Sequence, residues 1–521
     1  MPPIALGATG SRSIYSLPDD ILLLIISYIS VKDIITLRKT SLKFHELTKL
    51  RWVWSDAVQR HVIDKGLPLP AAGSSIKALS AQHLETRAVH AAKFNDNWYS
   101  AQPKPRTAIE FQVEGVNSDG SPAAIKEVVF LKGRCGEFLL TLTGTSIECW
   151  EVPLDGSGAY RIAEWTDENG IEQLHVNQDP THSVEVAYLT QDPADRSYTW
   201  IYTLSLDTFH GTFKPRSAMR GSRVQMAPIH LMHGDFVVMG DPLLVWHLTG
   251  PKAAKSMTRL INEAAADRDK ILTVKMVEDV LVVVRSTSVE VFRSPVWSAT
   301  EGRYTSQGYA ISALSIDAHP AREAVVMTRP NAGSDPFSSS LLPRSLPVTV
   351  LLLQSSQFLG LHTISQLDLL PATTPRCETS APFAFPAEVT RIYQVAASAC
   401  SLKVSSNGKG IWMQTHNITS RHAKYPARCI MGFDLASASQ QTASEHSQHK
   451  DPQVVLLKDK PSSLQGANDL HMCNSQLYAR RCDMSEILRR KYTLIAADLE
   501  DSVGRIAVGD RCGKVEVLDY V

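Results

Sequence analysis

Few residues in this sequence of 521 are spaced in a way that supports catalysis. Gly509-Asp510-Arg511-Cys512-Gly513-Lys514 is similar to a phosphate-binding loop, but it is one residue short between the glycines and lacks the Ser or Thr after the lysine. His471, Cys473 and Cys482 could supply soft metal ligands, but their spacing fits no standard zinc site. The motifs GxSxG and HExxH are also absent. We therefore predict a protein that is not an enzyme, with no catalytic residue, cofactor or metal.

One basic cluster could bind a charged partner. Lys214, Arg216, Arg220 and Arg223 lie in a loop-like stretch with no acidic residue between them. Arginine pairs bidentately with phosphate, so the cluster could form a rim for a phosphorylated or acidic protein target. Solvated surface charge is the other interpretation. Our prediction for target contact is Arg216, Arg220 and Arg223.

The composition limits the partners and the compartment. Lys plus Arg and Asp plus Glu both total 53, so the net charge is zero and gives no overall attraction to nucleic acid or to anionic membranes. The longest purely apolar stretch, Ile21–Ile26, is far shorter than the roughly 20 residues of a membrane-spanning helix. The eight cysteines include no CxxC pair and are expected to be reduced. We expect a cytoplasmic or nuclear protein with neither a nucleic-acid nor a membrane partner.

Residues 14–65 have the pattern of a small helical domain, after a segment 1–13 that we expect to be disordered. Leu17-Pro18-Asp19-Asp20 is typical of a helix start, and Ser30-Val31-Lys32-Asp33 indicates a second N-cap. The first helix carries apolar residues around most of its circumference, which predicts that it is buried on two sides, or on one side by its own domain and on the other by a partner. Residues 66–105 are predicted to be a linker with a helix over 74–99.

From about residue 106 to 521 the hydrophobic period becomes two. Short runs of β-branched and aromatic residues alternate with Gly, Asp, Asn and Pro turns, as in 137–152, 280–292 and 505–521. So many antiparallel hairpins favour a β-propeller, in which radial repetition leaves only short sheet edges. The predicted fold class is mainly β, with seven blades (six or eight possible) after a small all-α domain and a linker helix. Two consecutive β-sandwiches are the alternative.

The helical segment resembles an F-box. The match comprises Leu17-Pro18, the acidic pair that follows, Ile21 and Ile25, then Ile34 and Leu37-Arg38, and finally Ser41, Phe44 and Trp54. The linker, with Leu84-Glu85-Thr86-Arg87-Ala88 and Asn97-Trp98, is similar to that of fungal-type F-box proteins that carry a propeller. The remainder resembles a degenerate WD-repeat-like propeller in rhythm only, because Trp-Asp strand ends are missing.

The F-box resemblance implies docking to the Skp-family adaptor and, through it, to a cullin–RING ubiquitin ligase. The adaptor-binding residues that it implies are Leu17, Pro18, Ile21, Ile25, Ile34, Leu37, Phe44 and Trp54, and we expect the first six of them to form an exposed apolar face. The chain would then be the substrate-recognition subunit and would bind a protein target through the propeller. An F-box scaffold acting outside a ubiquitin ligase is the alternative, and the sequence does not separate the two.

A final prediction concerns the ends of the β region. Residues 108–113 and 515–521 both alternate like strands. A propeller that ends on a strand must pair its first and last segments or leave an open edge. We therefore predict that these two segments share a sheet or lie in adjacent blades.

Overall fold

A computed structural model describes residues 14–521 except 66, 68–77, 101–102, 116–121, 249–256, 263–268, 296, 299–302, 305–306, 317–318, 329–346, 356–360, 372–382, 385–389, 397–398, 406–407, 420–423, 436–475, 480–493 and 501. The segment 1–13 and the possible ligands His471, Cys473 and Cys482 lie outside the described residues. The chain divides into two compact units, residues 1–96 and 97–521. Within the described part, no helix has the length and apolarity to cross a membrane.

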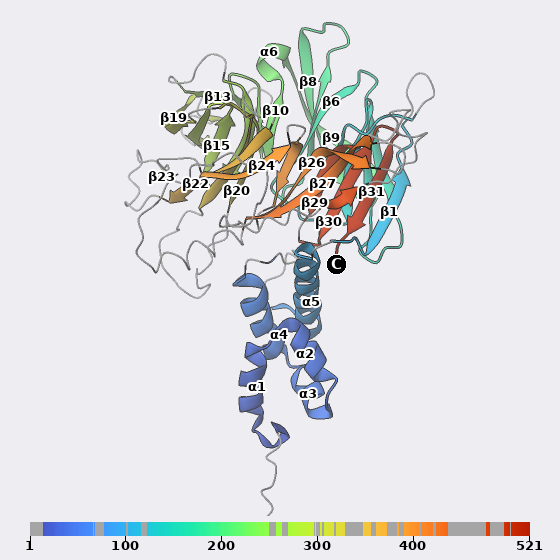
Figure 1. Cartoon of the computed structure of the whole chain (residues 1–521). Helices are drawn as coiled ribbons and strands as arrows, with labels where there is room; N and C mark the ends of the chain where they lie inside the picture. The colour runs from blue at the N-terminus through green and yellow to red at the C-terminus, as the bar shows by residue number, and fades with distance from the viewer. Residues whose placement is uncertain are drawn as a thin grey trace, which may run out of the picture. The chain divides into compact units, whose positions relative to one another are not determined.

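Unit 1 is helical (Figure 1). Its elements are η1 (Ile14–Ser16), α1 (Asp19–Tyr28), α2 (Val31–Arg38), α3 (Leu42–Leu47), α4 (Arg51–Val58), the π-helical turn η2 (Gln59–Ile63) and α5 (Ala81–Trp98), whose last two residues belong to unit 2. The predicted N-cap is confirmed, because the Ser30 hydroxyl accepts a hydrogen bond from the Asp33 N–H at 3.2 Å. Ser41 caps α3 in the same way, with the Phe44 N–H as donor.

Helix α5 packs with the helices that precede it. Its residues Leu84, Ala88 and Ala91 lie in the same hydrophobic core as Trp54 of α4. Arg38 of α2 reaches Glu85 of α5 through two hydrogen bonds of 2.7 and 2.9 Å. The helix starts at Ala81, later than the predicted residue 74.

Unit 2 consists mainly of antiparallel sheets, which confirms the predicted fold class at the level of a mainly β, propeller-like unit. Three four-stranded sheets contain β2 (Glu127–Phe130), β3 (Phe138–Leu142), β4 (Ser146–Glu151) and β5 (Tyr160–Thr166); β6 (Ile171–Val176), β7 (Val186–Gln191), β8 (Tyr198–Asp207) and β9 (Thr212–Ser222); and β25 (Cys400–Val404), β26 (Lys409–Thr419), β27 (Lys424–Asp434) and β28 (Gln476–Ala479). A short helix, α6 (Arg223–Met226), follows β9.

An eight-stranded sheet joins two groups of four strands. The first group is β10 (Ile229–His233), β11 (Phe236–Met239), β12 (Leu244–His247) and β13 (Met257–Ile261); the second is β14 (Ile271–Val277), β15 (Val280–Arg285), β16 (Ser288–Arg293) and β19 (Gln307–Ser315). Among the described strands, only the parallel pairing of β13 with β19 connects them. Strands β17 (Trp297–Ser298) and β18 (Arg303–Tyr304) form a separate pair.

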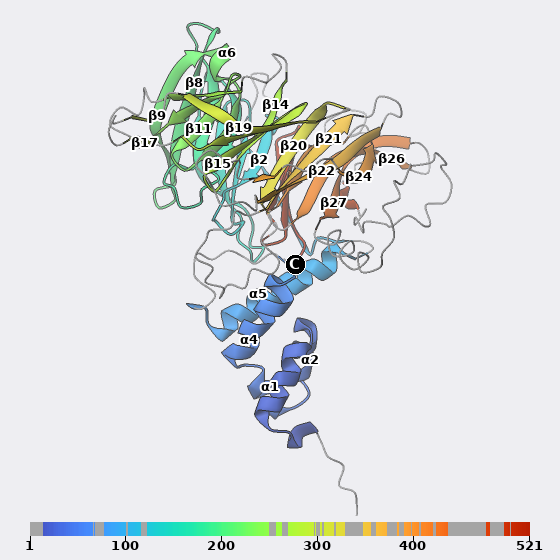
Figure 2. The ribbon, with the colours of Figure 1, turned by 90° about the vertical axis from the view of Figure 1, so that its left-hand side faces the viewer.

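Two further sheets complete unit 2. One contains β20 (Ala321–Thr328), β21 (Val348–Ser355), β22 (Leu361–Pro371), β23 (Phe383–Ala384) and β24 (Thr390–Ala396). Of these, β20, β21, β22 and β24 lie side by side in Figure 2. The other has the strand order β1 (Thr107–Gln112), β31 (Lys514–Asp519), β30 (Arg505–Asp510) and β29 (Leu494–Glu500).

The first strands of the sheets lie around a circle, and most of them contact the first strand of the next sheet; these strands are β2, β6, β10, β14, β20, β25 and β29. The contacts join β29 to β2, β6 to β10, β10 to β14, β14 to β20, β20 to β25 and β25 back to β29. The β2–β5 and β6–β9 sheets share a core that includes Leu140 and Leu174. Side chains also reach backbone N–H groups of the next sheet: the Asp498 carboxylate accepts from Phe130, and the Gln173 side-chain oxygen accepts from Ile229. This circular order is that of a propeller and not of two β-sandwiches.

The predicted pairing of the two ends of the β region is confirmed. Strand β1 pairs antiparallel with β31, and the register places Thr107 opposite Asp519 and Gln112 opposite Lys514. The two strands lie side by side in Figure 1. The sheet is thus closed by a segment from each end of the β region, which leaves β31 without an open edge.

Candidate protein-interaction sites

Helix α1 is apolar on two opposite sides. Leu22 and Ile26 are each 1% exposed and face the core of unit 1. Ile21, Leu24, Ile25 and Tyr28 form a second row at spacings of three and four residues and are 40%, 52%, 39% and 72% exposed. We call this row the α1 stripe. An apolar helix face left open in this way is typical of a protein interface.

The Leu17-Pro18 pair, with which the F-box-like motif begins, lies at the N-terminal end of α1. Pro18 is exposed and precedes the first residue of the helix, while Leu17 and Leu37 are half-buried against the core. Lys43 ties this end to α3, because its ammonium donates to the Leu17 carbonyl at 2.9 Å and pairs with the Asp19 carboxylate at 3.0 Å.

Three of the predicted adaptor-binding residues lie in the core instead. Ile34 is 1% exposed, Phe44 3% and Trp54 0%, so the expectation that Ile34 lies on an exposed face is wrong. The Trp54 indole donates to the Thr48 carbonyl at 2.7 Å, and the Arg38 guanidinium lies over its ring. We place these three residues among those that hold the helices together and leave them out of the contact surface.

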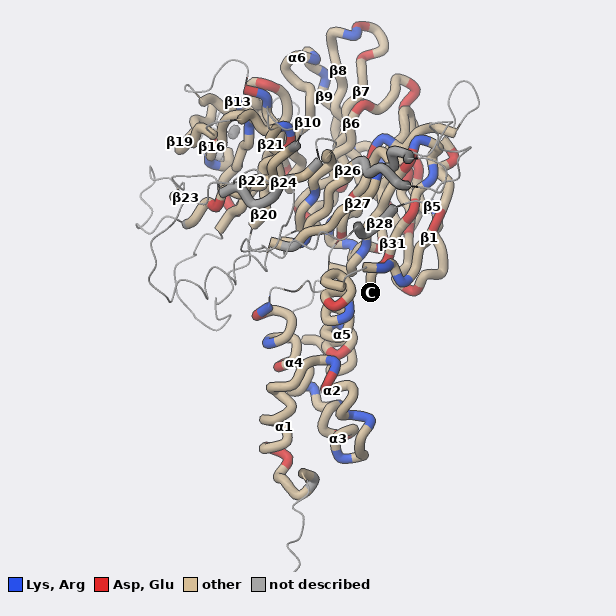
Figure 3. The backbone as a smooth tube through the Cα atoms, viewed as in Figure 1, with Lys and Arg blue, Asp and Glu red and all other residues tan. Residues whose placement is uncertain are grey.

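The basic cluster lies on regular structure and not in a loop. Arg216 and Arg220 belong to β9, and Arg223 begins α6. Arg220 pairs with the Asp192 carboxylate, Arg223 with Glu172 at 3.0 Å, and the Arg216 Nε donates to the Ser205 hydroxyl at 2.8 Å. Basic positions on β9 and α6 therefore lie among acidic ones on neighbouring strands (Figure 3). The acids come from β6 and from the end of β7, so a search between residues 214 and 223 could not find them.

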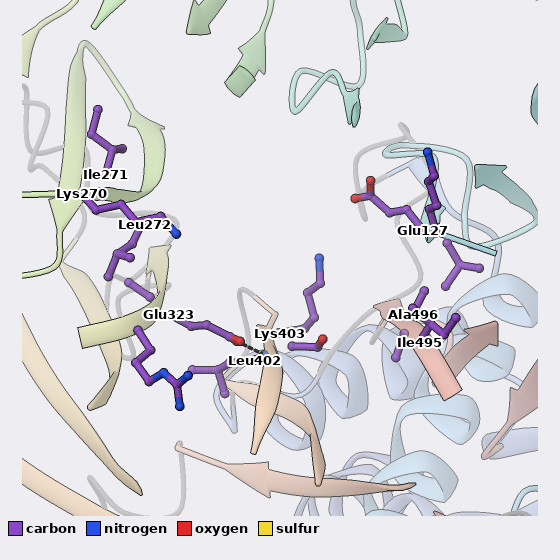
Figure 4. Close-up of a pocket in the computed structure, with 15 residues that line it drawn as sticks. Glu127, Lys270, Ile271, Leu272, Glu323, Leu402, Lys403, Ile495 and Ala496 are labelled. Atoms are coloured by element: carbon purple, nitrogen blue, oxygen red, sulfur yellow. Dashed lines mark hydrogen bonds between the residues drawn. The ribbon is translucent and has the colours of Figure 1, made fainter. Parts of the chain in front are cut away.

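A cavity of about 410 Å³ lies inside the circle of first strands. Its lining comes from the starts of β2, β14, β20, β25 and β29 and includes the cationic residues Lys126, Lys270, Arg322 and Lys403 and the acids Glu127 and Glu323. Figure 4 shows Lys270 and Lys403 extending into this space and Glu323 hydrogen-bonded at the backbone of Leu402. Burial raises the pKa of Glu127 to about 7, while nearby Lys403 acts to lower it.

Sequence reasoning missed this cavity. The signal that could have found it is a repeated one: a Lys or Arg stands at or next to the start of three separate strands, at positions 126, 270 and 322, and a fourth cation, Lys403, lies within β25. Among the described residues, no group of His, Cys, Asp and Glu side chains could hold a metal ion.

Comparison with known proteins identifies the first unit. The F-box domain model matches residues 14–56. No curated protein matches the chain.

Solved structures with a similar fold include the WD40 domain of SCAP from fission yeast, at 8% identity and a TM-score of 0.40 over 77% of this chain and 83% of that one. Sqt1 from Chaetomium thermophilum, crystallised with the N-terminus of the ribosomal protein L10, has 10% identity and a TM-score of 0.39 over 76% and 84%. A second Sqt1 structure has 13% identity and a TM-score of 0.41 over 78% and 85%.

The strand order of unit 2 defines its propeller-like fold, and the family match identifies the F-box domain within unit 1. The chain therefore carries an F-box domain at residues 14–56, followed by a mainly β, propeller-like unit.

Proposed function

We propose that this chain is the substrate-recognition subunit of a Skp–cullin–F-box ubiquitin ligase. The observation that carries the proposal is the F-box match at residues 14–56 together with the uncovered α1 stripe. F-box domains generally bind Skp-type adaptors, and an adaptor would cover this apolar row. The propeller-like unit would hold a protein target.

The proposed contact surface differs from the one expected from the motif. It keeps the accessible residues Pro18, Ile21 and Ile25 and the half-buried Leu17 and Leu37. It gains Leu24 and Tyr28, since they complete the α1 stripe and are the most exposed of its members. Buried apolar anchors at an interface often contribute about 2 kcal/mol or more each when truncated.

The chain would contribute proximity to the reaction. The ubiquitin-conjugating enzyme performs the chemistry, and the receptor holds target lysines at high effective concentration near its thioester. F-box and propeller modules typically act in this way, as interaction modules without catalysis. The predicted site of action is the cytoplasm, the nucleus or both.

We further propose seven blades for the propeller. The eight-stranded sheet counts as two blades, because a single parallel pairing between β13 and β19 joins two antiparallel groups of four. With the sheet that contains β1 and β31, this division gives every blade four main strands, and β23 is an addition to the β20–β24 blade. Rigid blades carry variable loops on their faces, which is where we expect target contacts.

Copurification of the full chain with the adaptor and with cullin tests the proposal. The variant Ile21→Glu/Ile25→Glu should lose the adaptor, because it places two charges in the α1 stripe. Leu154→Glu is the matched control, since Leu154 is 46% exposed but lies in unit 2. Adaptor binding that survives in the double variant would contradict the assignment of this surface.

The same experiment separates the ligase from the scaffold. If the chain is a ligase subunit, cullin copurifies with it together with the adaptor. Removing the chain from cells should then slow the turnover of at least one protein. Recovery of the adaptor without cullin, with no change in the turnover of any protein, would instead identify a scaffold.

A further inference from the structure

The cavity inside the ring carries an excess of positive charge. Four cationic side chains line it, from four different strands or strand starts, against two carboxylates. Lys126 donates to the Ile171 carbonyl at 2.9 Å, and the Arg322 Nη1 lies 3.1 Å from the His362 ring. Neither contact neutralises a charge, so the lining keeps four positive charges.

The two carboxylates are already engaged by the backbone. The Glu323 Oε2 accepts the Leu402 N–H at 3.0 Å, which ties β20 to β25. Glu127 interacts with the backbone of Leu174, which ties β2 to β6. Both acids therefore hold neighbouring sheets together, while Lys270 and Lys403 extend into the open space (Figure 4).

The backbone of β25 is distorted at the point that positions Lys403. The pairing of β25 with β26 shifts register between Cys400 and Lys403, so this strand contains a bulge. Inside the bulge, Ser401 has a φ of 55°, which a residue with a side chain rarely adopts. Bulges re-aim side chains, and strained residues of this kind cluster at ligand sites.

We propose that this cavity binds a compact polyanion, a free small molecule with two or more phosphate or carboxylate groups. The volume of about 410 Å³ lies in the range of small-molecule sites. The first strands surround the cavity, so a bound compact group would have cationic side chains on several sides. Ammonium and guanidinium groups bind such anions through charge-assisted hydrogen bonds. The site does not depend on the F-box, so it stands or falls separately from adaptor binding.

The test uses the full-length chain and inorganic tripolyphosphate as the probe, with citrate as a second polyanion. Binding is measured by isothermal titration calorimetry at constant ionic strength, with chloride in excess. We expect saturable binding, weakened about tenfold or more in Lys270→Gln/Lys403→Gln, since each lysine supplies a charge-assisted contact. The matched control is Arg259→Gln/Arg293→Gln, which removes the same charge from exposed positions of β13 and β16 and should bind as the original chain does.

A thermal melt of each variant without ligand checks folding. If the lysine variant is unstable, Ser401→Gly and Lys403→Gln are compared singly. Glycine suits the positive φ, so Ser401→Gly should keep the affinity that Lys403→Gln loses. Absence of binding by both probes, or equal affinity in the lysine and control variants, would overturn the proposal.

Discussion

The guanidinium of Arg505 forms a two-point ion pair with the carboxylate of Asp519, its cross-strand neighbour on β31. The Nε–Oδ1 distance is 2.6 Å and the Nη2–Oδ2 distance is 3.1 Å. The same guanidinium donates to the carbonyls of Gly136, Val152 and Pro153, which belong to the β2–β5 sheet or its loops. A single fully buried side chain thus joins the closing sheet to the next one.

Arg505→Ala should destabilise the propeller unit by about 3–5 kcal/mol, because it removes the ion-pair partner of the half-buried Asp519 carboxylate and a charged donor from three carbonyls. Chemical denaturation gives the free energy of unfolding. Arg293→Ala is the control, since Arg293 is exposed, and it should change stability by less than about 0.5 kcal/mol. A loss below about 1 kcal/mol in Arg505→Ala would show that the network contributes little.

Removal of residues 515–521 should open the ring. These residues contain most of β31, which lies between β1 and β30, so β1 loses its only sheet partner among the described strands. We expect a clearly lower melting temperature and a broader transition for the whole β region. Deletion of residues 1–13 serves as the control. A truncated chain that melts at the original temperature would contradict closure through β31.

The arginines of β9 and α6 should not contribute equally to target capture. Arg220 and Arg223 already pair with Asp192 and Glu172, whereas Arg216 donates a hydrogen bond to the neutral hydroxyl of Ser205. We expect Arg216→Glu to reduce recovery of copurifying proteins at low salt and less so at high salt, because salt screens exposed charges.

Arg220→Glu is the comparison for that experiment. It should mainly lower stability, since the Asp192 side chain is 5% exposed and would face a second carboxylate. Quantitative mass spectrometry of the copurified proteins checks capture, and a thermal melt checks stability. Unchanged recovery for Arg216→Glu at both salt concentrations would exclude the anion-binding rim.

The sequence predicts those parts of the fold that depend on a local residue pattern, such as strands and helix N-caps. Alternation in residues 108–113 and 515–521 predicted the two strands that pair, and Ser30 before a helical run predicted an N-cap. It could not decide which apolar side of α1 faces the core, because both sides carry the same residue types. For that reason Leu24 and Tyr28 were overlooked. Ile34, on α2, was expected on an exposed face and is buried, because the motif match does not show which side of α2 packs against the core.

Contacts between distant segments leave no local pattern. Arg505 and its carbonyl partners lie more than 350 residues apart in the chain. The four cations of the cavity are likewise dispersed from Lys126 to Lys403, and only the arrangement of β2, β14, β20 and β25 around the circle brings them together. The composition does not reveal this cavity either, because a net charge of zero for the whole chain does not show a local excess of positive charge.

Glu148 on β4 provides a test that depends on pH. Its side chain is fully buried, and neither carboxyl oxygen has a hydrogen-bond partner of normal geometry among the described residues. Burial raises the pKa of Glu148 to about 7, and the carboxylates of Glu164, directly opposite on β5, and Glu114 act in the same direction. Arg161 opposes them, and the backbone of Glu114 does so more weakly.

A raised carboxyl pKa means that the folded state holds a proton that the unfolded state releases. Stability therefore falls as the pH rises from about 4.5 to about 7 and stays lower above that range. Glu148→Gln keeps the shape and removes the charge. It should leave stability nearly unchanged at pH 4.5 and raise it by about 2–3 kcal/mol at pH 8.

Denaturant titrations of the original chain and the variant at both pH values give this difference directly. Taking the difference also cancels the pH dependence that Glu127 adds to both proteins. Glu168→Gln, at an exposed turn position, is the control and should show no such trend. If Glu148→Gln changes stability equally at pH 4.5 and pH 8, the pKa of Glu148 is the same in the folded and the unfolded protein, and the side chain is ionised in the folded protein at neutral pH. The charge would then have to be compensated inside the β2–β5 sheet, by Arg161, which already pairs with Glu114 and Glu164.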